Sequence, residues 1–209
     1  MKKLLSFIAL AVIAVSSFAQ TPAQILSRME EEMTAHEPEG IVMTIDVKIP
    51  ILGVMTSKTY ALGDKSFIKA SLMGKNINTW INSGCTYIYD PDENEVTIKD
   101  YSTEDDADAD NAKMFDGISE GYNVTLKKET DVAWYLQCKR LKSNTDKDAP
   151  KELEVVVSKK NYWPLSLTTK AKGTTIVLRG ISFGVSEEKV TFDINKYPGI
   201  KVIDKRSQK

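Results

Sequence analysis

The chain has 209 residues, with 28 Lys and Arg against 29 Asp and Glu, and a formal net charge of −1. A near-neutral chain without a block of Lys or Arg argues against a nucleic-acid-binding protein, and its length suits a single domain with a substantial core. One histidine and two cysteines leave little material for a metal site or for histidine-dependent catalysis.

Residues 1–19 predict a secretory signal peptide. Lys2 and Lys3 precede an apolar run over residues 4–15, and Ser17 and Ala19 supply small residues for cleavage after Ala19. The run is shorter than the roughly 20 residues that a transmembrane helix needs, and no Cys follows it to carry a lipid anchor. We therefore expect a periplasmic protein with one mature domain over 20–209. Its net charge becomes −3, because the two signal lysines are removed.

The mature domain is predicted to open with an amphipathic helix. Thr21 and Gln24 form a capping box, and Pro22 occupies the first helical position. The helix is expected to end before Pro38. Its apolar face comprises Ile25, Leu26, Met29 and Met33.

After this helix the hydrophobic period changes from 3.6 to 2, which predicts strands. In the first half they cover 41–49, 54–62, 67–73, 77–81, 86–89 and 95–99. In the second half they cover 123–128, 133–141, 153–158, 165–171 and 174–183, and a further strand is expected at 190–192. Short connections favour antiparallel neighbours. The predicted fold class is mainly β (α+β), a single curved antiparallel sheet with few helices.

One long insertion interrupts the strands. Residues 104–110 are acidic, and Met114, Phe115 and Ile118 then follow at helical spacing. The pattern predicts a loop and a short amphipathic helix, and a long insertion between strands is often functional.

The stretch Gly180-Ile181-Ser182-Phe183-Gly184 matches the G-x-S-x-G pattern of serine esterases. Such a nucleophile needs a strand, a sharp turn and a helix, with a histidine later in the chain. His36 is the only histidine and lies far upstream. The glycines are better explained as points of backbone freedom in or after a strand, so we expect no enzyme and no catalytic residue.

Metal and phosphate sites have equally little support. Asp106, Asp108 and Asp110 resemble the start of a calcium loop, but Gly117 stands where the bidentate Glu should be. No zinc-ligand spacing and no phosphate-binding glycine motif is present. We expect no metal and no cofactor.

The supply of apolar surface is the most informative feature. The alternating strands offer a wide apolar face that two small helices cover only in part. Two interpretations remain open: a closed core beneath the helices, or a curved sheet whose concave face holds a ligand cavity.

The order of elements resembles that of the LolA-like family, the periplasmic outer-membrane lipoprotein carriers. The resemblance rests on a secreted chain that opens with a helix followed by strands, on the segment YIYDPDENEVTI (87–98), and on the ending VTFDINKYPGIKVIDKR (190–206). It spans the mature chain from Thr21 to Arg206. It implies an incomplete β-barrel whose concave face is plugged by helices that act as a lid over a hydrophobic cavity.

The resemblance also implies a role as a monomeric carrier that shelters the acyl chains of lipoproteins or a related lipid. An inner-membrane lipoprotein-releasing transporter and an outer-membrane acceptor are the implied partners. The implied lid contacts are Ile25, Met29, Met33, Met114, Phe115 and Ile118. The implied sheet contacts are Met43, Ile45, Val47, Tyr60, Ile68, Ala70, Leu72, Trp80, Tyr87 and Tyr89. A one-residue error in register would invert any of these strand assignments.

The sequence departs from the family at one turn. Gly63-Asp64-Lys65 stands where the family commonly has an Arg-Pro pair whose Arg latches the lid. A lipid- or peptide-sensing module of the cell envelope stays the alternative function.

An oxidising compartment permits a disulfide between Cys85 and Cys138, and their spacing leaves that pairing open.

Overall fold

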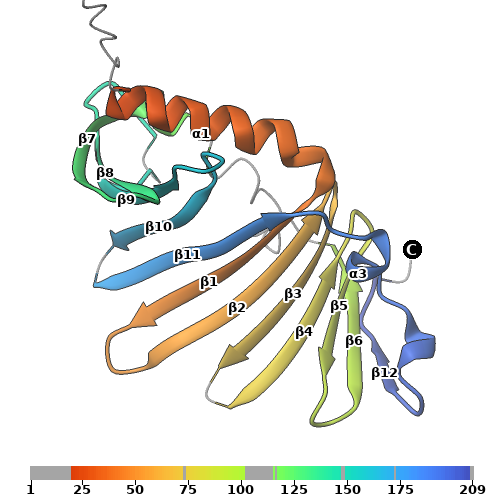
Figure 1. Cartoon of the computed structure of the whole chain (residues 1–209). Coiled ribbons are helices and arrows are strands. Elements are labelled where there is room, and N and C mark those ends of the chain that lie inside the picture. Colours follow the sequence, from red (N-terminus) through yellow and green to blue (C-terminus); the bar gives the residue numbers. More distant parts are fainter. Residues whose placement is uncertain are drawn as a thin grey trace, which may run out of the picture.

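The computed structural model describes residues 20–72, 74–101, 115, 117–146, 149–171 and 173–207. One large, open, curved sheet dominates it, and a long helix crosses one end of the strands (Figure 1). The predicted Met114 and the predicted signal peptide lie outside the described residues. None of the described helices combines the length and apolar character that a membrane crossing requires.

The sheet contains twelve strands within the described residues, in the order β12-β6-β5-β4-β3-β2-β1-β11-β10-β9-β8-β7. The first-half strands are β1 (Ile41–Ile49), β2 (Gly53–Leu62), β3 (Lys65–Leu72), β4 (Lys75–Ile81), β5 (Cys85–Asp90) and β6 (Glu95–Asp100). The second-half strands are β7 (Tyr122–Glu129), β8 (Ala133–Arg140), β9 (Glu152–Ser158), β10 (Pro164–Ala171), β11 (Thr174–Phe183) and β12 (Lys201–Asp204).

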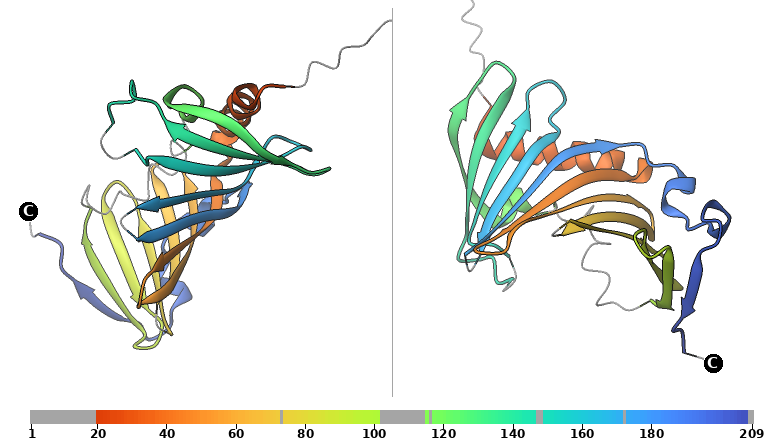
Figure 2. Two further views of the ribbon diagram at one scale, coloured as in Figure 1. Left: turned by 90° about the vertical axis from the view of Figure 1, so that its left-hand side faces the viewer. Right: turned by 90° about the horizontal axis from the view of Figure 1, so that it is seen from below.

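Strand pairing follows the short connections, as predicted. Neighbours are antiparallel with one exception, β12, which joins the edge of the sheet parallel to β6. β12 is reached through the C-terminal segment rather than a hairpin, so antiparallel pairing is not imposed on it. β7 and β12 form the two ends of the strand order, and the sheet does not close into a barrel (Figure 2).

The N-terminal helix α1 (Pro22–His36) forms as the sequence predicts, and a 3-10 turn, η1 (Glu37–Glu39), follows it. The Gln24 amide donates to Thr21 Oγ1 at 3.2 Å, and the Thr21 amide donates to Gln24 Oε1 at 2.9 Å. This reciprocal pair satisfies two amides that a helix start otherwise leaves without partners. The apolar stripe Ile25, Leu26, Met29 and Met33 is buried at 0–4% exposure.

The sheet has two differently covered faces. We call the one that carries α1 the helix face; its cluster joins α1 to β1, β8, β9, β10 and β11 through residues such as Met43, Leu136, Val155, Leu167 and Leu178.

The opposite face, the tail face, carries a second cluster formed by Phe67, Trp80, Tyr89, Val96, Ile98 and Val190. The C-terminal segment covers it with α3 (Glu187–Val190) and the 3-10 turn η4 (Ile194–Lys196). The sheet therefore buries apolar side chains on both faces.

The junction between α1 and β1 requires glycine. Gly40 has φ of 74°, and a Cβ at this position would lie 2.6 Å from the Ala61 carbonyl oxygen and 2.8 Å from Val185 Cβ. The Gly40 carbonyl accepts a hydrogen bond from the Gly184 amide at 3.2 Å. A side chain is therefore excluded by both conformation and space where the chain turns from helix to sheet.

A part-buried ion pair links β1 to β11. Arg179 Nε donates to Asp46 Oδ2 at 2.6 Å, and Thr56 Oγ1 donates to Asp46 Oδ1 at 2.7 Å. The Arg179 hydrogen bond, followed by that from Thr56, holds the pKa of Asp46 below its ordinary value.

Two local predictions differ from the structure. Residues 190–192 do not form a strand: Val190 ends the one-turn helix α3 and is 2% exposed against the tail-face cluster. Its β-branched side chain favours a strand locally, but packing decides the conformation.

Cys85 and Cys138 are free thiols and do not form a disulfide in this fold. Their strands, β5 and β8, are eight places apart in the strand order, and the two residues belong to different clusters.

Candidate functional site

The helix face contains a cavity of about 520 Å³ near the strand ends that point away from α1. Its walls come from β1, β9, β10 and β11, and α2 (Ile118–Gly121) with the loop before β9 closes its side. The lining residues are Ile45, Val47, Gly117, Ile118, Tyr122, Asn144, Asp146, Ala149, Pro150, Leu153, Leu167, Thr169, Ile176 and Leu178. The size falls in the range of about 300–1,000 Å³ that small-molecule sites occupy.

The polar groups at the cavity wall are largely engaged by the protein. The Tyr122 hydroxyl donates to the Pro150 carbonyl at 2.8 Å, and Thr169 Oγ1 donates to the Glu152 carbonyl at 3.2 Å. Asn144 Oδ1 accepts from the Asp146 amide at 3.1 Å. Because these groups are satisfied, the inner wall presents mainly aliphatic side chains and suits an apolar ligand.

The cavity rim is braced by one arginine. Arg140 Nη1 donates to the Asp146 carbonyl at 2.9 Å and to the Ala149 carbonyl at 2.7 Å. Both carbonyls belong to the loop that lines the cavity, so Arg140 holds this loop against the end of β8.

A carboxylate joins α1 to α2 beside the cavity. Glu30 Oε1 accepts from the Ser119 amide at 2.8 Å, and Glu30 Oε2 accepts from Ser119 Oγ. Ile118, next to Ser119, is 4% exposed and lines the cavity. Beneath this contact, burial raises the pKa of the Cys138 thiol to about 12, and the charge of Glu30 adds to the effect. The Glu30–Ser119 contact therefore fixes a wall of the cavity.

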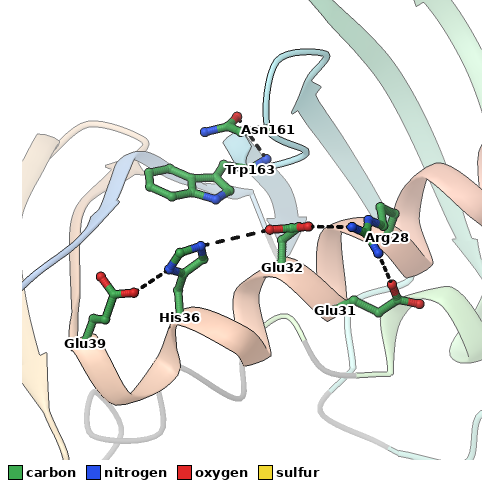
Figure 3. Close-up of polar contacts among 7 residues, drawn as sticks. All are labelled: Arg28, Glu31, Glu32, His36, Glu39, Asn161 and Trp163. Atoms are coloured by element: carbon green, nitrogen blue, oxygen red, sulfur yellow. Dashed lines mark hydrogen bonds and ion pairs between the residues drawn. The ribbon is translucent and has the colours of Figure 1, made fainter.

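The exposed side of α1 carries a chain of charges that ends on aromatic rings (Figure 3). Arg28 Nη2 lies 3.0 Å from Glu32, and His36 Nδ1 lies 2.6 Å from Glu39 Oε1. The His36 ring packs edge-on against Trp163 at a centroid distance of 5.3 Å. The C-terminal end of α1 is thereby tied to the β9–β10 connection, and the helix is a fixed part of the core.

The structure places the predicted lid residues together. Ile25, Met29 and Met33 are buried residues of α1. Phe115 and Ile118 belong to the same cluster, at 0% and 4% exposure. Of these five, Ile118 lines the cavity, while the others belong to the same hydrophobic cluster without lining it.

The predicted sheet residues do not form one surface. Met43, Ile45 and Val47 lie on the helix face, and the last two line the cavity. Ile68 pairs with Thr59, and Thr59 pairs with Met43, so Ile68 shares this face, as does Ala70 by alternation. The side chain of Leu72 lies outside the described part of the chain.

The predicted aromatic residues lie on the tail face instead. Tyr60 stacks on Phe67 at 5.7 Å between centroids, and Phe67 stacks on Trp80 at 4.6 Å. Tyr87 and Tyr89 continue this row and pack against Phe192 and Tyr197 of the C-terminal segment, respectively. This row of rings holds the C-terminal segment on the sheet, away from the cavity. Aromatic content alone does not reveal which face a strand residue occupies.

The wall residues absent from the prediction include four aliphatic strand residues: Leu153, Leu167, Ile176 and Leu178. Each lies in a strand that the sequence did predict, and Ile176 and Leu178 alternate with Val177 and Arg179. Selecting candidate cavity residues from the second-half strands as well as the first-half strands would have found them.

The G-x-S-x-G stretch forms no catalytic arrangement. Ser182 lies within β11 opposite Val42 and is exposed, whereas its neighbour Phe183 stacks on His36 at 5.0 Å. Successive strand residues point to opposite faces, so Ser182 and His36 are on different sides of the sheet. Among the described residues, no group of three His, Cys, Asp or Glu side chains could hold a metal ion.

Comparison with known proteins supports a likeness of fold. No protein-family model and no curated protein matches the sequence. Among solved structures, LprF from Mycobacterium bovis matches over 80% of this chain and 96% of its own, with 8% identity and a TM-score of 0.53.

Two further structures match more loosely. An uncharacterized conserved protein from Thermus thermophilus matches over 87% of this chain and 97% of its own, with 15% identity and a TM-score of 0.46. A LolA superfamily protein from Nitrosomonas europaea matches over 85% and 100%, with 12% identity and a TM-score of 0.36. These likenesses are of fold alone, and the structures include a LolA superfamily protein, the family that the sequence resembles.

Proposed function

We propose that this protein is a periplasmic carrier that shelters acyl chains, those of lipoproteins or of a related lipid, in the helix-face cavity. The observation that carries the proposal is the cavity itself: a space of about 520 Å³ with mainly aliphatic walls, in which the Tyr122 and Thr169 hydroxyls already have partners. The predicted signal peptide, cleaved after Ala19, gives the protein access to the compartment between the two membranes.

The physical need for such a carrier is large. Moving one CH₂ group from water into an apolar site gains about 0.8 kcal/mol, so a sixteen-carbon chain left in water costs on the order of 12 kcal/mol. A carrier needs no reactive group to remove this cost. It needs a dry cavity, an entrance and a wall that can open. We propose that α2, fixed by the contact of Glu30 with Ser119, is that wall.

Transfer requires two further proteins in this scheme. An inner-membrane lipoprotein-releasing transporter would load the cavity, and an outer-membrane acceptor would empty it. The carrier would act as a monomer and without catalysis, because each step is an exchange of apolar surroundings.

The test is binding of a fluorescent fatty acid to the purified protein, together with native mass spectrometry of protein taken from a bacterial periplasm. Val47→Glu places a carboxylate in the cavity at a half-buried position and should weaken probe binding at least about 100-fold, since an unpaired charge is costly in an apolar site. Val132→Glu is the matched control, because Val132 is 70% exposed and does not line the cavity.

The proposal predicts acyl adducts on the parent and probe binding that Val47→Glu removes and Val132→Glu preserves. A protein that carries no lipid and ignores the probe would favour the sensing module instead. Equal probe binding by the parent and Val47→Glu would show that the ligand does not enter this cavity.

A further inference from the structure

The sheet ends far from α1 expose an unusual set of apolar side chains. Ile51, Leu52 and Val54 in the β1–β2 turn are 105%, 61% and 54% exposed. This turn projects from the middle of the sheet, at the opposite end from α1 (Figure 1).

Ile51 is an unusual residue type for the backbone conformation and for the exposure of its position. It has φ of 74°, a region that a β-branched residue occupies at a cost and that Gly or Asn would occupy more easily. A fully exposed turn position also favours a polar residue. Since the folded chain itself gains nothing from this side chain, a surface outside the protein is the better explanation for it.

Basic residues surround the apolar turn. Lys48 precedes it, Lys75 begins β4 in the adjacent β3–β4 turn, and Lys170 lies near the end of β10; all three are exposed. The β10–β11 turn is also adjacent, since a Cβ on Gly173 would lie 3.8 Å from Pro50 Cγ. In the described part of the chain, none of these lysines forms an ion pair.

The sequences of the three turns contain lysine and no acidic residue over 47–55, 69–77 and 168–176. The β5–β6 turn at this end is acidic, with Asp90, Asp92 and Glu93, and is separated from β1–β2 by β3 and β4 in the strand order. The loop before β9, at the same end, contains Asp146 and is separated from β1 by β11 and β10. We call the set Lys48, Ile51, Leu52, Val54, Lys75 and Lys170 the tip surface.

The tip surface lies next to the cavity. Ile45 and Val47 line the cavity, and Ile49 is the next residue of β1 on the same face. Asn144 and Pro150, at the rim, belong to the loop that leads into β9 at the same end of the sheet. Apolar surface therefore continues from the cavity along β1 to the exposed turn.

We propose that the tip surface binds the face of an anionic phospholipid bilayer, with Ile51 and Leu52 inserted among the lipids and the lysines on the headgroups. Apolar side chains flanked by exposed cations are the combination that interfacial binding to anionic lipid requires. If the cavity holds an acyl chain, as proposed above, this orientation lets the chain pass between bilayer and cavity without crossing water.

The experiment is co-sedimentation of the purified protein with vesicles of phosphatidylglycerol and phosphatidylcholine in equal amounts, and with vesicles of phosphatidylcholine alone. Three variants are compared with the parent: Ile51→Asp/Leu52→Asp, Lys48→Gln/Lys170→Gln, and the control Val132→Asp. Val132 is a 70% exposed residue of the β7–β8 connection, at the α1 end of the sheet. Circular dichroism and fatty-acid probe binding are measured on every variant.

We expect the parent to bind the anionic vesicles at least about tenfold more tightly than the neutral ones. Ile51→Asp/Leu52→Asp should lose at least about tenfold in binding to anionic vesicles, and Lys48→Gln/Lys170→Gln should lose most of the preference for anionic lipid. Both should keep their fold and their probe binding, and Val132→Asp should behave as the parent.

A parent that ignores vesicles, or an Ile51→Asp/Leu52→Asp variant that binds them as well as the parent, would overturn the proposal. So would an equal loss in Val132→Asp. Probe binding is read separately, so a failed cavity and a failed membrane surface give different results.

Discussion

Removal of the Glu30 carboxylate should detach α2 from α1. Hydrogen bonds to a charged acceptor contribute about 1.5–3 kcal/mol each, and both bonds from Ser119 end on this carboxylate. The site is part-buried, so the lower end of that range applies, and Glu30→Ala should lose about 2–3 kcal/mol of local stability. The population with α2 detached would then rise about 30- to 150-fold.

Native-state hydrogen exchange measures this directly. The Ser119 amide donates to Glu30, so its protection should fall by the same 30- to 150-fold in Glu30→Ala. A bound fluorescent fatty acid should leave faster as well, because Ile118 is a wall of the cavity. Ser119→Ala removes the hydroxyl and keeps the amide, and should give a smaller change.

Glu31→Ala is the matched control. It removes the same charge from the neighbouring position of α1, where the carboxylate is 60% exposed and paired with Arg28. Surface pairs of this kind contribute about 0–1 kcal/mol. Unchanged protection of Ser119 in Glu30→Ala, or an equal change in Glu31→Ala, would refute the assignment of Glu30 as the residue that fixes α2.

Three further outcomes follow from the structure. Gly40→Ala should lower the free energy of unfolding by about 2–4 kcal/mol in urea titration, since φ of 74° and two contacts under 3 Å oppose a Cβ; a loss below about 0.5 kcal/mol would contradict this geometry. At about pH 8, a thiol reagent should label Cys85 in the folded protein and Cys138 only after unfolding, because burial raises the pKa of Cys138 to about 12; two rapidly labelled thiols, or none, would disprove the assignment. Asp46→Asn should cost about 1 kcal/mol at neutral pH, a modest value because Arg179 is half-exposed. The pKa of Asp46 is lowered in the folded state, so its stabilising effect is present above about pH 4 and is lost as pH falls further; thermal unfolding of parent and variant should therefore converge in acid, and a constant difference would contradict the ion pair.

The predicted elements that hold in the structure rest on local physics. Thr21 and Gln24 set the start of α1 because a capping box involves only neighbouring residues. The period-2 alternation of β1 and β11 identified them as strands, and short connections gave their antiparallel pairing. Val190 shows the limit of such reasoning, since its strand preference yields to burial in a helical turn on the tail face.

The candidate site was predicted in part for a related reason. Ile45, Val47 and Ile118, which the sequence selected by their apolar patterns, line one cavity, because an apolar helix and an apolar strand face must meet. Tyr60 and Trp80 were grouped with them, yet they stack on the other side of the sheet. Alternation shows that successive side chains of a strand point to opposite faces of the sheet. It does not show which of the two faces packs against the helix.

The sequence by itself determined the elements of this protein: a capped helix, a long series of strands and the aliphatic character of what they bury. Only the tertiary structure decided which face received α1, which received the C-terminal segment, and where a cavity was left between them. The physical reason is distance along the chain. Capping and alternation act within a few residues, whereas the cavity depends on contacts such as Glu30 with Ser119, which are 89 residues apart.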